Sequence, residues 1–507
     1  MKIFKTSCIV MAAVMLLAGC SKRQSATTGW NYNDSKWGGF ENIDGPTQRT
    51  APGLVFIEGG SFTMGRVADD SRYQWNNVAH TVTVSSFYLD ECEVTNTAYR
   101  EYVYWMQRAF GEEYPELVAA IYPDTNAWRD KLAWRESFVD YYFQNPVYDD
   151  YPVVGVSWRQ ANEYCRWRTD RVNEKILIDM GLLPLDQAEL DGAQAFQTDV
   201  YLAGMYKGET REGLKNLDPA AGGESRQVRK QDGILVPYYR LPTEAEWEFA
   251  ALGLIGNTYD ERIVEHKIYP WAGSSVRSSN RKYYGQFLAN FKRSRGDAMG
   301  VAGNLNDGWD YTAPVRWYFP NDYGLYNMAG NVSEWCMDVY RKDANPLGAS
   351  DQDPYRGNIY RTVTIEDEEV LINDTTGSIV YRNVDDDMNR RNYRQADNVN
   401  YLDGDYASGI NPDNWNPTAE GDDEYAEEGN RFTDQDSITN EMYRRVGNNN
   451  LTTSSLISNK VRVVKGGSWK DRAYWMQAGT RRYYDEDKST AWIGFRCAMD
   501  SFGPRHK

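Results

Sequence analysis

The sequence has very little histidine, few cysteines and a deficit of basic residues. It contains 3 His and 6 Cys in 507 residues, and it has no C-x-x-C pair. Zinc and iron–sulfur sites usually need closely spaced ligands of these types, so we do not expect them. The 56 Lys and Arg residues are outnumbered by 73 Asp and Glu, which gives a net charge of −17. Because phosphate binding needs a basic face, nucleic acid is not an expected partner.

Aromatic residues and glycine, by contrast, are abundant. The chain has 37 Tyr, 17 Trp and 42 Gly. This many aromatic side chains argue against a wholly disordered chain, and frequent glycine with many Asn and Asp indicates turns and loops. The length allows a large core and two or three domains. We therefore expect a loop-rich globular protein. Its acidic balance favours solubility, with calcium binding as the functional alternative.

The first twenty residues, MKIFKTSCIVMAAVMLLAGC, have the organisation of a secretory signal. Lys2 and Lys5 form a basic start, and an apolar run follows that is too short for an ordinary membrane span. The L-A-G-C ending resembles a bacterial lipobox, which implies removal of residues 1–19 and lipidation of Cys20. A plain secretory signal is the alternative. Residues 20–50 then form a polar, glycine-rich tether.

The residues next to Cys20 bear on the site of anchoring. Ser21 and Lys22 follow it, without the aspartate that retains lipoproteins at the inner membrane. We therefore expect the outer membrane. Because this stretch is basic rather than acidic, we favour its periplasmic face.

Four cysteines remain after processing: Cys92, Cys165, Cys336 and Cys497. An oxidising envelope favours one or two disulfides among them. Their spacing alone leaves the pairing open.

Hydrophobic periodicity and capping residues predict a series of short elements. Strands are predicted at 54–57, from 62 onward, at 81–89 and at 461–469. Helices are predicted to begin at the caps Thr95, Ser157 and Thr243, and the second is predicted to end at about Arg168. The segments at about 107–150, 170–238 and 343–460 are interpreted as insertions, with a hairpin in 363–384.

Seven motifs occur along the chain in a fixed order. They are PGLVFIEGGSFTMG, SFYLDECEVTN, YPVVGVSWRQANEYCRW, YRLPTEAEWEFAA, NDYGLYNMAGNVSEW, RVVKGGSW and GFRCA. Together they resemble the formylglycine-generating-enzyme, or sulfatase-modifying-factor, domain. The resemblance implies a loop-rich α+β fold, related to C-type-lectin-like folds, over residues 51–503 with the three insertions.

The resemblance also addresses catalysis. Active enzymes of this family carry two cysteines after the GGSW-like turn, where they bind copper and oxidise a substrate cysteine with oxygen. Here those positions hold Asp471 and Met476, which cannot supply thiolate ligands or nucleophiles. Another branch of the superfamily holds iron through histidines, but the three histidines here lack its spacing. We therefore expect a protein that is not an enzyme and binds neither copper nor iron.

Calcium ligands of the family, by contrast, have matching residues. The resemblance implies a first Ca²⁺ site from Asn290, Phe291, Asp307 and Trp309, and a second from Asn327, Gly330, Val332 and Glu334. Oxygen donors that include several main-chain carbonyls suit this hard cation. The alternative for the second set is turn and capping chemistry.

The resemblance further implies a disulfide between Cys165 and Cys497. Cys92 and Cys336 are then a pair only because no other cysteines are left.

The run Arg481 to Tyr484 has two interpretations. It could line the groove that binds substrate in active family members and bind a peptide or another subunit. Alternatively, it could pack in the core with stacked guanidinium groups, which is the interpretation that we favour.

A lipobox, a start with TGWNYNDSKWGGFE, the domain above and its long insertions together also resemble gliding-motility lipoproteins of Bacteroidota. This narrower resemblance implies a structural scaffold at the outer membrane, with partners among the lipoproteins and ring components of the gliding and type IX secretion machinery. The insertions are the expected contact surfaces. Two alternatives stay open: a glycan- or peptidoglycan-binding lipoprotein, and an enzyme with an unrecognised site.

Overall fold

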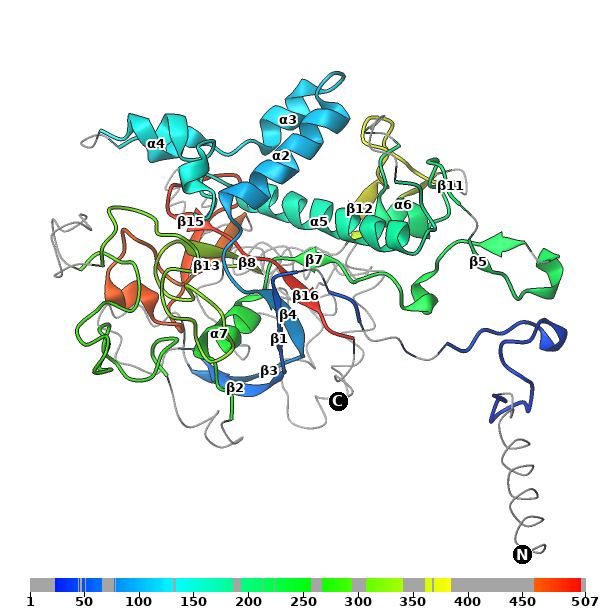
Figure 1. Ribbon diagram of the computed structural model, residues 1–507, viewed down its shortest axis with the longest axis horizontal. Helices are drawn as coiled ribbons and strands as arrows, with labels where there is room; N and C mark the ends of the chain where they lie inside the picture. Colours follow the sequence, from blue (N-terminus) through cyan, green and yellow to red (C-terminus); the bar gives the residue numbers. More distant parts are fainter. Residues whose placement is uncertain are drawn as a thin grey trace, which may run out of the picture. The chain divides into compact units, whose positions relative to one another are not determined.

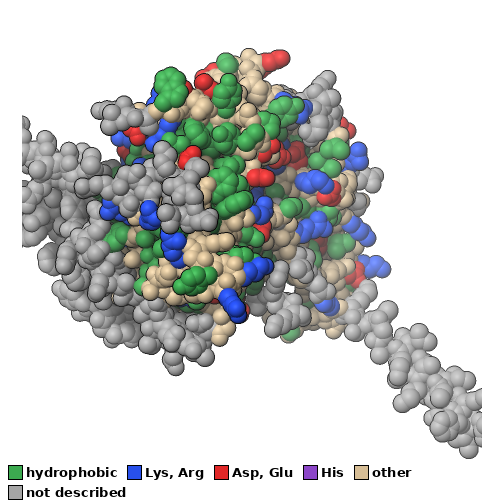
Figure 2. Space-filling model, turned by 60° about the vertical axis from the view of Figure 1, so that its left-hand side comes forward, with side chains coloured by type: hydrophobic (Ala, Val, Ile, Leu, Met, Phe, Trp, Pro, Cys, Tyr) green, Lys and Arg blue, Asp and Glu red, His purple; other side chains and the backbone are tan. Residues whose placement is uncertain are grey.

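The computed structural model describes residues 23–43, 45, 48–50, 52–65, 77, 79–130, 134–185, 192, 194–211, 213–222, 224–256, 267–293, 307–340, 361–366, 369–383 and 460–502. Residues 1–19, Cys20 and most of the insertion at 343–460 lie outside them. No helix in these ranges is long and apolar enough to cross a membrane. On the face in Figure 2, hydrophobic, basic and acidic side chains are interspersed.

The helices begin largely where the sequence predicts. Thr95 Oγ1 accepts a hydrogen bond from Ala98 N at 3.2 Å, and Thr243 forms a capping box with Glu246. The helices are α2 (Asn96–Phe110), α3 (Pro115–Ile121), α4 (Glu136–Tyr141), α5 (Trp158–Asp179), α6 (Thr198–Leu202) and α7 (Glu244–Leu252).

Helix α5 is longer than predicted. Its capping box is present, since Ser157 N donates to Gln160 Oε1 at 2.8 Å. The predicted end at about Arg168 is wrong, because no glycine or proline occurs until Gly181, which has a φ of 73°. The helix continues through Leu177, which is fully buried in a cluster with Phe196.

The strands form two four-stranded sheets and several hairpins (Figure 1). They are β1 (Leu54–Ile57), β2 (Gly60–Met64), β3 (His80–Val84), β4 (Phe87–Asp90), β5 (Leu214–Lys215), β6 (Ser225–Arg226), β7 (Tyr239–Arg240), β8 (Ser333–Val339), β9 (Arg361–Val363), β10 (Ile365–Glu366), β11 (Glu369–Val370), β12 (Tyr381–Asn383), β13 (Val461–Lys465), β14 (Arg482–Asp485), β15 (Ile493–Gly494) and β16 (Ala498–Asp500). One sheet has the order β1-β4-β16-β7 and is antiparallel. The other has the order β14-β13-β8-β15, and only its β15–β8 pair is parallel.

The predicted strand at 81–89 is in fact two strands. β3 pairs with β2 and β4 pairs with β1, so the chain changes partner between Val84 and Phe87. Ser86 Oγ accepts a hydrogen bond from Gly59 N at 3.0 Å at this change. Ser85 and Ser86 interrupt the alternation at the break, and the prediction of a single strand over 81–89 did not use this signal. The predicted hairpin at 363–384 is confirmed by the β9–β12 and β10–β11 pairs.

The chain divides into two compact units. Among the described residues, the first unit comprises parts of 23–49, 173–185 and 196–236, and the second holds the rest. Within the first unit, Arg226 Nε donates to Glu41 Oε1 at 3.0 Å, and Arg226 Nη1 pairs with Asp232 Oδ2 at 2.7 Å. The segment expected as a tether therefore packs against the segment expected as the insertion at 170–238.

The core of the second unit surrounds α7. This helix packs against β2, β3, β8 and β13, and Trp247 and Phe249 on it are fully buried. Gly466 follows β13 with a φ of 90°, and a Cβ there would lie 3.0 Å from the Trp247 ring. The glycine-rich turn at the end of β13 therefore lies directly on α7.

Candidate functional site

The loop predicted to bind the second calcium leads into β8. Asn327 and Asn331 have positive φ angles of 51° and 62°, which asparagine tolerates better than most residues. Gly330 has a φ of 78°, and a Cβ at this position would lie 2.4 Å from the main-chain oxygen of Asn290. Only glycine permits this approach. The loop is therefore held against Asn290, which belongs to the predicted first site.

Glu334 is buried, and both of its carboxylate oxygens are engaged. Oε1 accepts a hydrogen bond from Arg496 Nη2 at 2.6 Å, while Oε2 accepts from Arg496 Nε at 2.6 Å and from Trp247 Nε1 at 2.7 Å. Arg496 also donates to the main-chain oxygens of Asp90 and Tyr326. Burial acts against the charge of Arg496, but Glu334 outweighs it and raises the pKa of the guanidinium.

A second buried carboxylate, that of Glu93, belongs to the same group. Its Oε1 accepts from Asn331 Nδ2 at 2.9 Å, and its Oε2 accepts from Asn327 Nδ2 at 3.1 Å. Burial raises the pKa of Glu93 to about 7, and Arg496 opposes this effect. Glu93 is not among the site residues predicted from the sequence. Its place in the SFYLDECEVTN motif, two residues before the cap Thr95, was the available signal.

The residues of the predicted first site also lie together. Asp307 accepts hydrogen bonds from the main-chain nitrogens of Phe291 and Trp309, at 3.0 and 3.2 Å. Asn290 Nδ2 donates to the main-chain oxygen of Tyr311 at 2.6 Å. The Asp307 carboxylate thus connects Phe291 and Trp309 through their main-chain N–H groups.

The second predicted site fits a hard divalent cation more closely. In the described part of the chain, no three His, Cys, Asp or Glu side chains converge as metal ligands, so amide and main-chain oxygens would have to contribute. Asn327 Oδ1 is buried without a hydrogen-bond partner, as expected of an atom whose partner is an ion. The main-chain oxygens of Gly330 and Val332 follow on the same loop. Glu334 retains lone-pair capacity beside its three hydrogen bonds. Calcium at this site stays a prediction.

Asp471 and Met476 occupy the positions where the resemblance places catalytic cysteines. Asp471 Oδ2 accepts a hydrogen bond from Ser468 Oγ at 2.5 Å and also pairs with Arg482. Met476 ends the 3₁₀-helix Ala473–Met476 and is fully buried. Its hydrophobic cluster includes Tyr269, Phe287, Ala289, Phe291 and Ala329. The Asp471 carboxylate is therefore held in an ion pair, and the Met476 thioether is packed in the core.

The four described cysteines are free thiols. Cys165 and Cys497 lie with their sulfurs 3.5 Å apart, a hydrogen-bond distance rather than the ~2.05 Å of a disulfide. The structure brings the predicted pair together but does not join it. Cys336 is buried and Cys92 is partly exposed, and they are not joined either. Burial raises the pKa of Cys165 and Cys336, and it raises that of Cys92 to about 12.

The run Arg481 to Tyr484 is only partly in the core. Arg481 is buried, and its Nε donates to Glu244 Oε1 at 2.5 Å. Its guanidinium lies 4.9 Å from the centre of the Tyr340 ring, and that of Arg482 lies 4.4 Å from the centre of the Trp492 ring. Arg482 and Tyr484 are half-buried and Tyr483 is exposed. The predicted core packing therefore describes Arg481 and does not extend to the other three residues.

These features define a loop-rich α+β domain in which left-handed turns and buried ion pairs take the place of long regular elements. The chain belongs to the family of the sulfatase-modifying factor enzyme 1-like domain, whose model matches residues 40–501. The predicted family and fold class are thereby confirmed.

Two relatives with similar identity to this chain have names that differ in activity. The chain is 26% identical over 297 residues to a "Formylglycine-generating enzyme" of Thermomonospora curvata, covering 58% of this chain and 74% of that protein. It is 26% identical over 309 residues to an "Inactive C-alpha-formylglycine-generating enzyme 2" of Mus musculus, covering 57% and 70%. Among solved structures, PvdO from Pseudomonas aeruginosa has a TM-score of 0.37 and 15% identity, covering 91% of this chain and 100% of that one. Family membership alone does not decide between activity and inactivity.

Proposed function

We propose that this protein is a catalytically inactive member of the family that works as a lipid-anchored scaffold of the gliding motility and type IX secretion machinery. It would lie at the periplasmic face of the outer membrane, as in gliding lipoproteins of the GldJ type. The observation that supports catalytic inactivity is how Asp471 and Met476 are engaged at the positions of the family's catalytic cysteines. One forms an ion pair with Arg482, and the other is fully buried.

The described thiols support the same conclusion. A nucleophilic or copper-binding cysteine must be a thiolate, and such cysteines have lowered pKa values. Here burial raises the pKa of Cys92, Cys165 and Cys336 instead. The existence of a relative named as inactive shows that the family accommodates proteins without this chemistry.

The membrane part of the proposal is supported by the segment that follows Cys20. Trp30, Trp37, Phe40 and Ile43 are 54%, 45%, 65% and 45% exposed. Tryptophan and phenylalanine next to a lipid anchor suit the interface between headgroups and water. A lipid on Cys20 would place these side chains within reach of the bilayer.

Two experiments test the parts separately. In the first, the lipidated protein is purified from its own envelope in mild detergent, beside Cys20→Ser as the control, and bound proteins are identified by mass spectrometry. We expect gliding or secretion components with the wild type and their depletion with the variant. Recovery of the wild type alone would refute the scaffold.

In the second, the purified protein is incubated with copper and a cysteine peptide carrying a sulfatase motif. The enzyme of Thermomonospora curvata serves as the positive control. We expect no aldehyde above background, and aldehyde formation by the wild type would show that the protein is active.

A further inference from the structure

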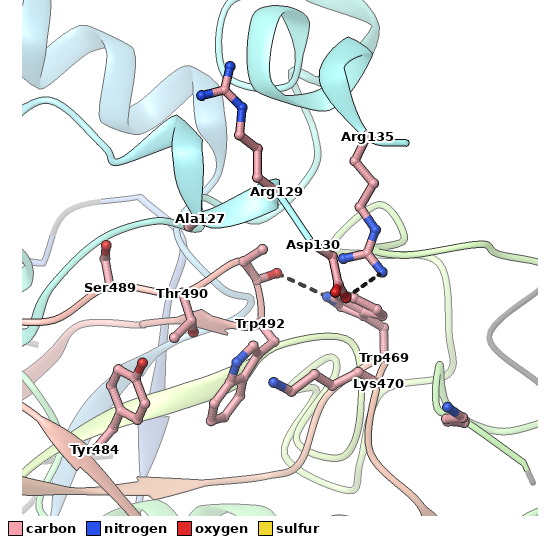
Figure 3. Close-up of a pocket in the computed structure, with 12 residues that line it drawn as sticks. Ala127, Arg129, Asp130, Arg135, Trp469, Lys470, Tyr484, Ser489, Thr490 and Trp492 are labelled. Atoms are coloured by element: carbon pink, nitrogen blue, oxygen red, sulfur yellow. Dashed lines mark hydrogen bonds and ion pairs between the residues drawn. The ribbon is translucent and has the colours of Figure 1, made fainter. Parts of the chain in front are cut away.

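A pocket of about 510 Å³ opens in the second unit, beside the turn that carries Asp471 (Figure 3). Its wall is built from three segments that are distant in the sequence. The first contributes Ala127, Arg129, Asp130 and Arg135, the second Trp469 and Lys470 after β13, and the third the loop 489–492 before β15, with Lys292 and Tyr484 completing the wall. All of these residues are described and belong to the same unit.

The charge of the pocket is opposite to that of the chain. Four lining residues are cationic, namely Arg129, Arg135, Lys292 and Lys470, and only Asp130 is acidic. Arg129 is paired with Glu136 at 2.9 Å, which still leaves an excess of positive charge. In a chain of net charge −17, such a pocket focuses a positive field and attracts anions.

Lys470 is the central cation. Figure 3 shows its side chain extending toward Trp492, and its ammonium lies 4.0 Å from the centre of that ring. Partial withdrawal from water is the main cause that lowers the pKa of Lys470 to about 8. Arg482 and Arg135 act in the same direction, and Asp471 and Asp130 oppose them. Its charge is therefore undercompensated where it stands. An anion in the pocket would restore the balance.

Arg135 provides a second, partly satisfied cation. Its Nη2 lies 3.7 Å from Asp130 Oδ2, which is beyond hydrogen-bond distance, and the Asp130 side chain is 55% exposed. The pocket wall thus already accommodates one carboxylate loosely. Thr490, 9% exposed, also lines the pocket, and its Oγ1 is buried without a hydrogen-bond partner.

The aromatic residues of the pocket are not arranged for a neutral sugar. A sugar needs an open ring face, but Lys470 and Arg482 both lie over Trp492, at 4.0 and 4.4 Å. Trp469 is 6% exposed and stacks on Trp128 with their planes 13° apart. The side chains presented to a ligand are therefore the cations rather than the rings.

We propose that this pocket binds a carboxylate-bearing ligand through the Lys470 ammonium and the Arg135 guanidinium. The inference does not depend on the scaffold function, since it rests on the pocket alone. The carboxylate can come from a small organic acid or from an acidic polypeptide segment, and the two sources are distinguished by experiment.

The test is calorimetric titration of the full chain in detergent with a hexaglutamate peptide, with succinate, and with chitohexaose as the neutral glycan. We expect the peptide to bind, and we expect Lys470→Gln to weaken binding about tenfold or more. Lys470→Gln with Arg135→Gln should abolish it. Binding of succinate as well would identify a small acid as sufficient, and binding of the peptide alone would identify a polypeptide.

The matched control is Lys282→Gln, which removes the same charge from an exposed lysine outside the pocket. We expect it to leave the affinity unchanged within about twofold, because exposed charges contribute little. Equal weakening by Lys282→Gln and Lys470→Gln would show unspecific attraction and overturn the proposal. So would a wild type that binds neither carboxylate, or one that binds only chitohexaose.

The pH dependence gives an independent readout. Asp130, Asp471, Arg135, Arg482 and Lys292 face or flank Lys470. Aspartate and arginine keep their charge between pH 7 and pH 9, so affinity should fall as Lys470 loses its proton near pH 8. Lys470→Arg should retain binding and flatten this profile, because arginine stays protonated. A wild-type profile that is flat over this range would contradict the role of Lys470.

Discussion

Arg496 donates two hydrogen bonds of 2.6 Å to the carboxylate of Glu334, and both side chains are fully buried. This pair joins the beginning of β8 to the segment between β15 and β16. Because a buried charge without its partner is costly, the pair is a sensitive point of the fold.

Replacing Arg496 with Met should therefore destabilise the protein by about 3–5 kcal/mol, since Glu334 would be left as an uncompensated buried charge. Urea unfolding followed by circular dichroism measures the loss. The solvent-exposed pair of Arg129 and Glu136 supplies the control, and Arg129→Met should leave the free energy of unfolding almost unchanged. Similar losses from the two variants would show that burial of the first pair is unimportant.

Gly330 and Gly273 form a matched pair for measuring the energetic effect of the close approach between the loop 327–332 and the main chain of Asn290. Both have positive φ angles, 78° and 90°, but a Cβ would meet Asn290 O at 2.4 Å in the first case and nothing within 4 Å in the second. Gly273→Ala should cost about 1–2 kcal/mol from backbone strain alone. Gly330→Ala should cost about 1–3 kcal/mol more because of the clash. Equal values from denaturant unfolding would mean that the loop shifts away freely.

Calcium should stabilise the protein through Asn327. A ligand that binds only the folded state at about 100 times its Kd adds about 2.7 kcal/mol to the free energy of unfolding. We expect EGTA to lower the melting temperature, and we expect Ca²⁺, but not Mg²⁺, to restore it, since Mg²⁺ demands a more regular site. Asn327→Ala should remove the response. A wild type that is indifferent to EGTA and contains no bound metal would contradict the site.

The thiols of Cys165 and Cys497 should form a disulfide when the protein is exposed to an oxidising compartment. Their sulfurs lie 3.5 Å apart across 332 positions of sequence, so a bond would close a very long loop and add about 4–5 kcal/mol in the entropic model. Alkylation of the denatured protein, followed by mass spectrometry, should find these two protected and Cys336 labelled. Labelling of both before reduction would show that the disulfide does not form.

Part of the fold could be predicted from local sequence. The caps at Thr95, Ser157 and Thr243 correctly mark helix starts, because a cap depends only on residues within one turn. The end of α5 and the break between β3 and β4 were missed. Both depend on distant partners: burial of Leu177 with Phe196 in the first case, and a change of neighbouring strand in the second.

The sequence by itself determined the family, the order of the motifs and the absence of cysteine at positions 471 and 476, since these are properties of residue identity along the chain. Only the tertiary structure decided that Glu93 lies beside Asn327 and Asn331, and that Lys470 and Arg135 line one pocket. The physical reason is separation: Arg135 and Lys470 are brought together by packing of segments that share no local signal. The burial of Arg135 and Lys470 and the pKa of Lys470 follow from that packing, so they cannot be predicted from either segment alone.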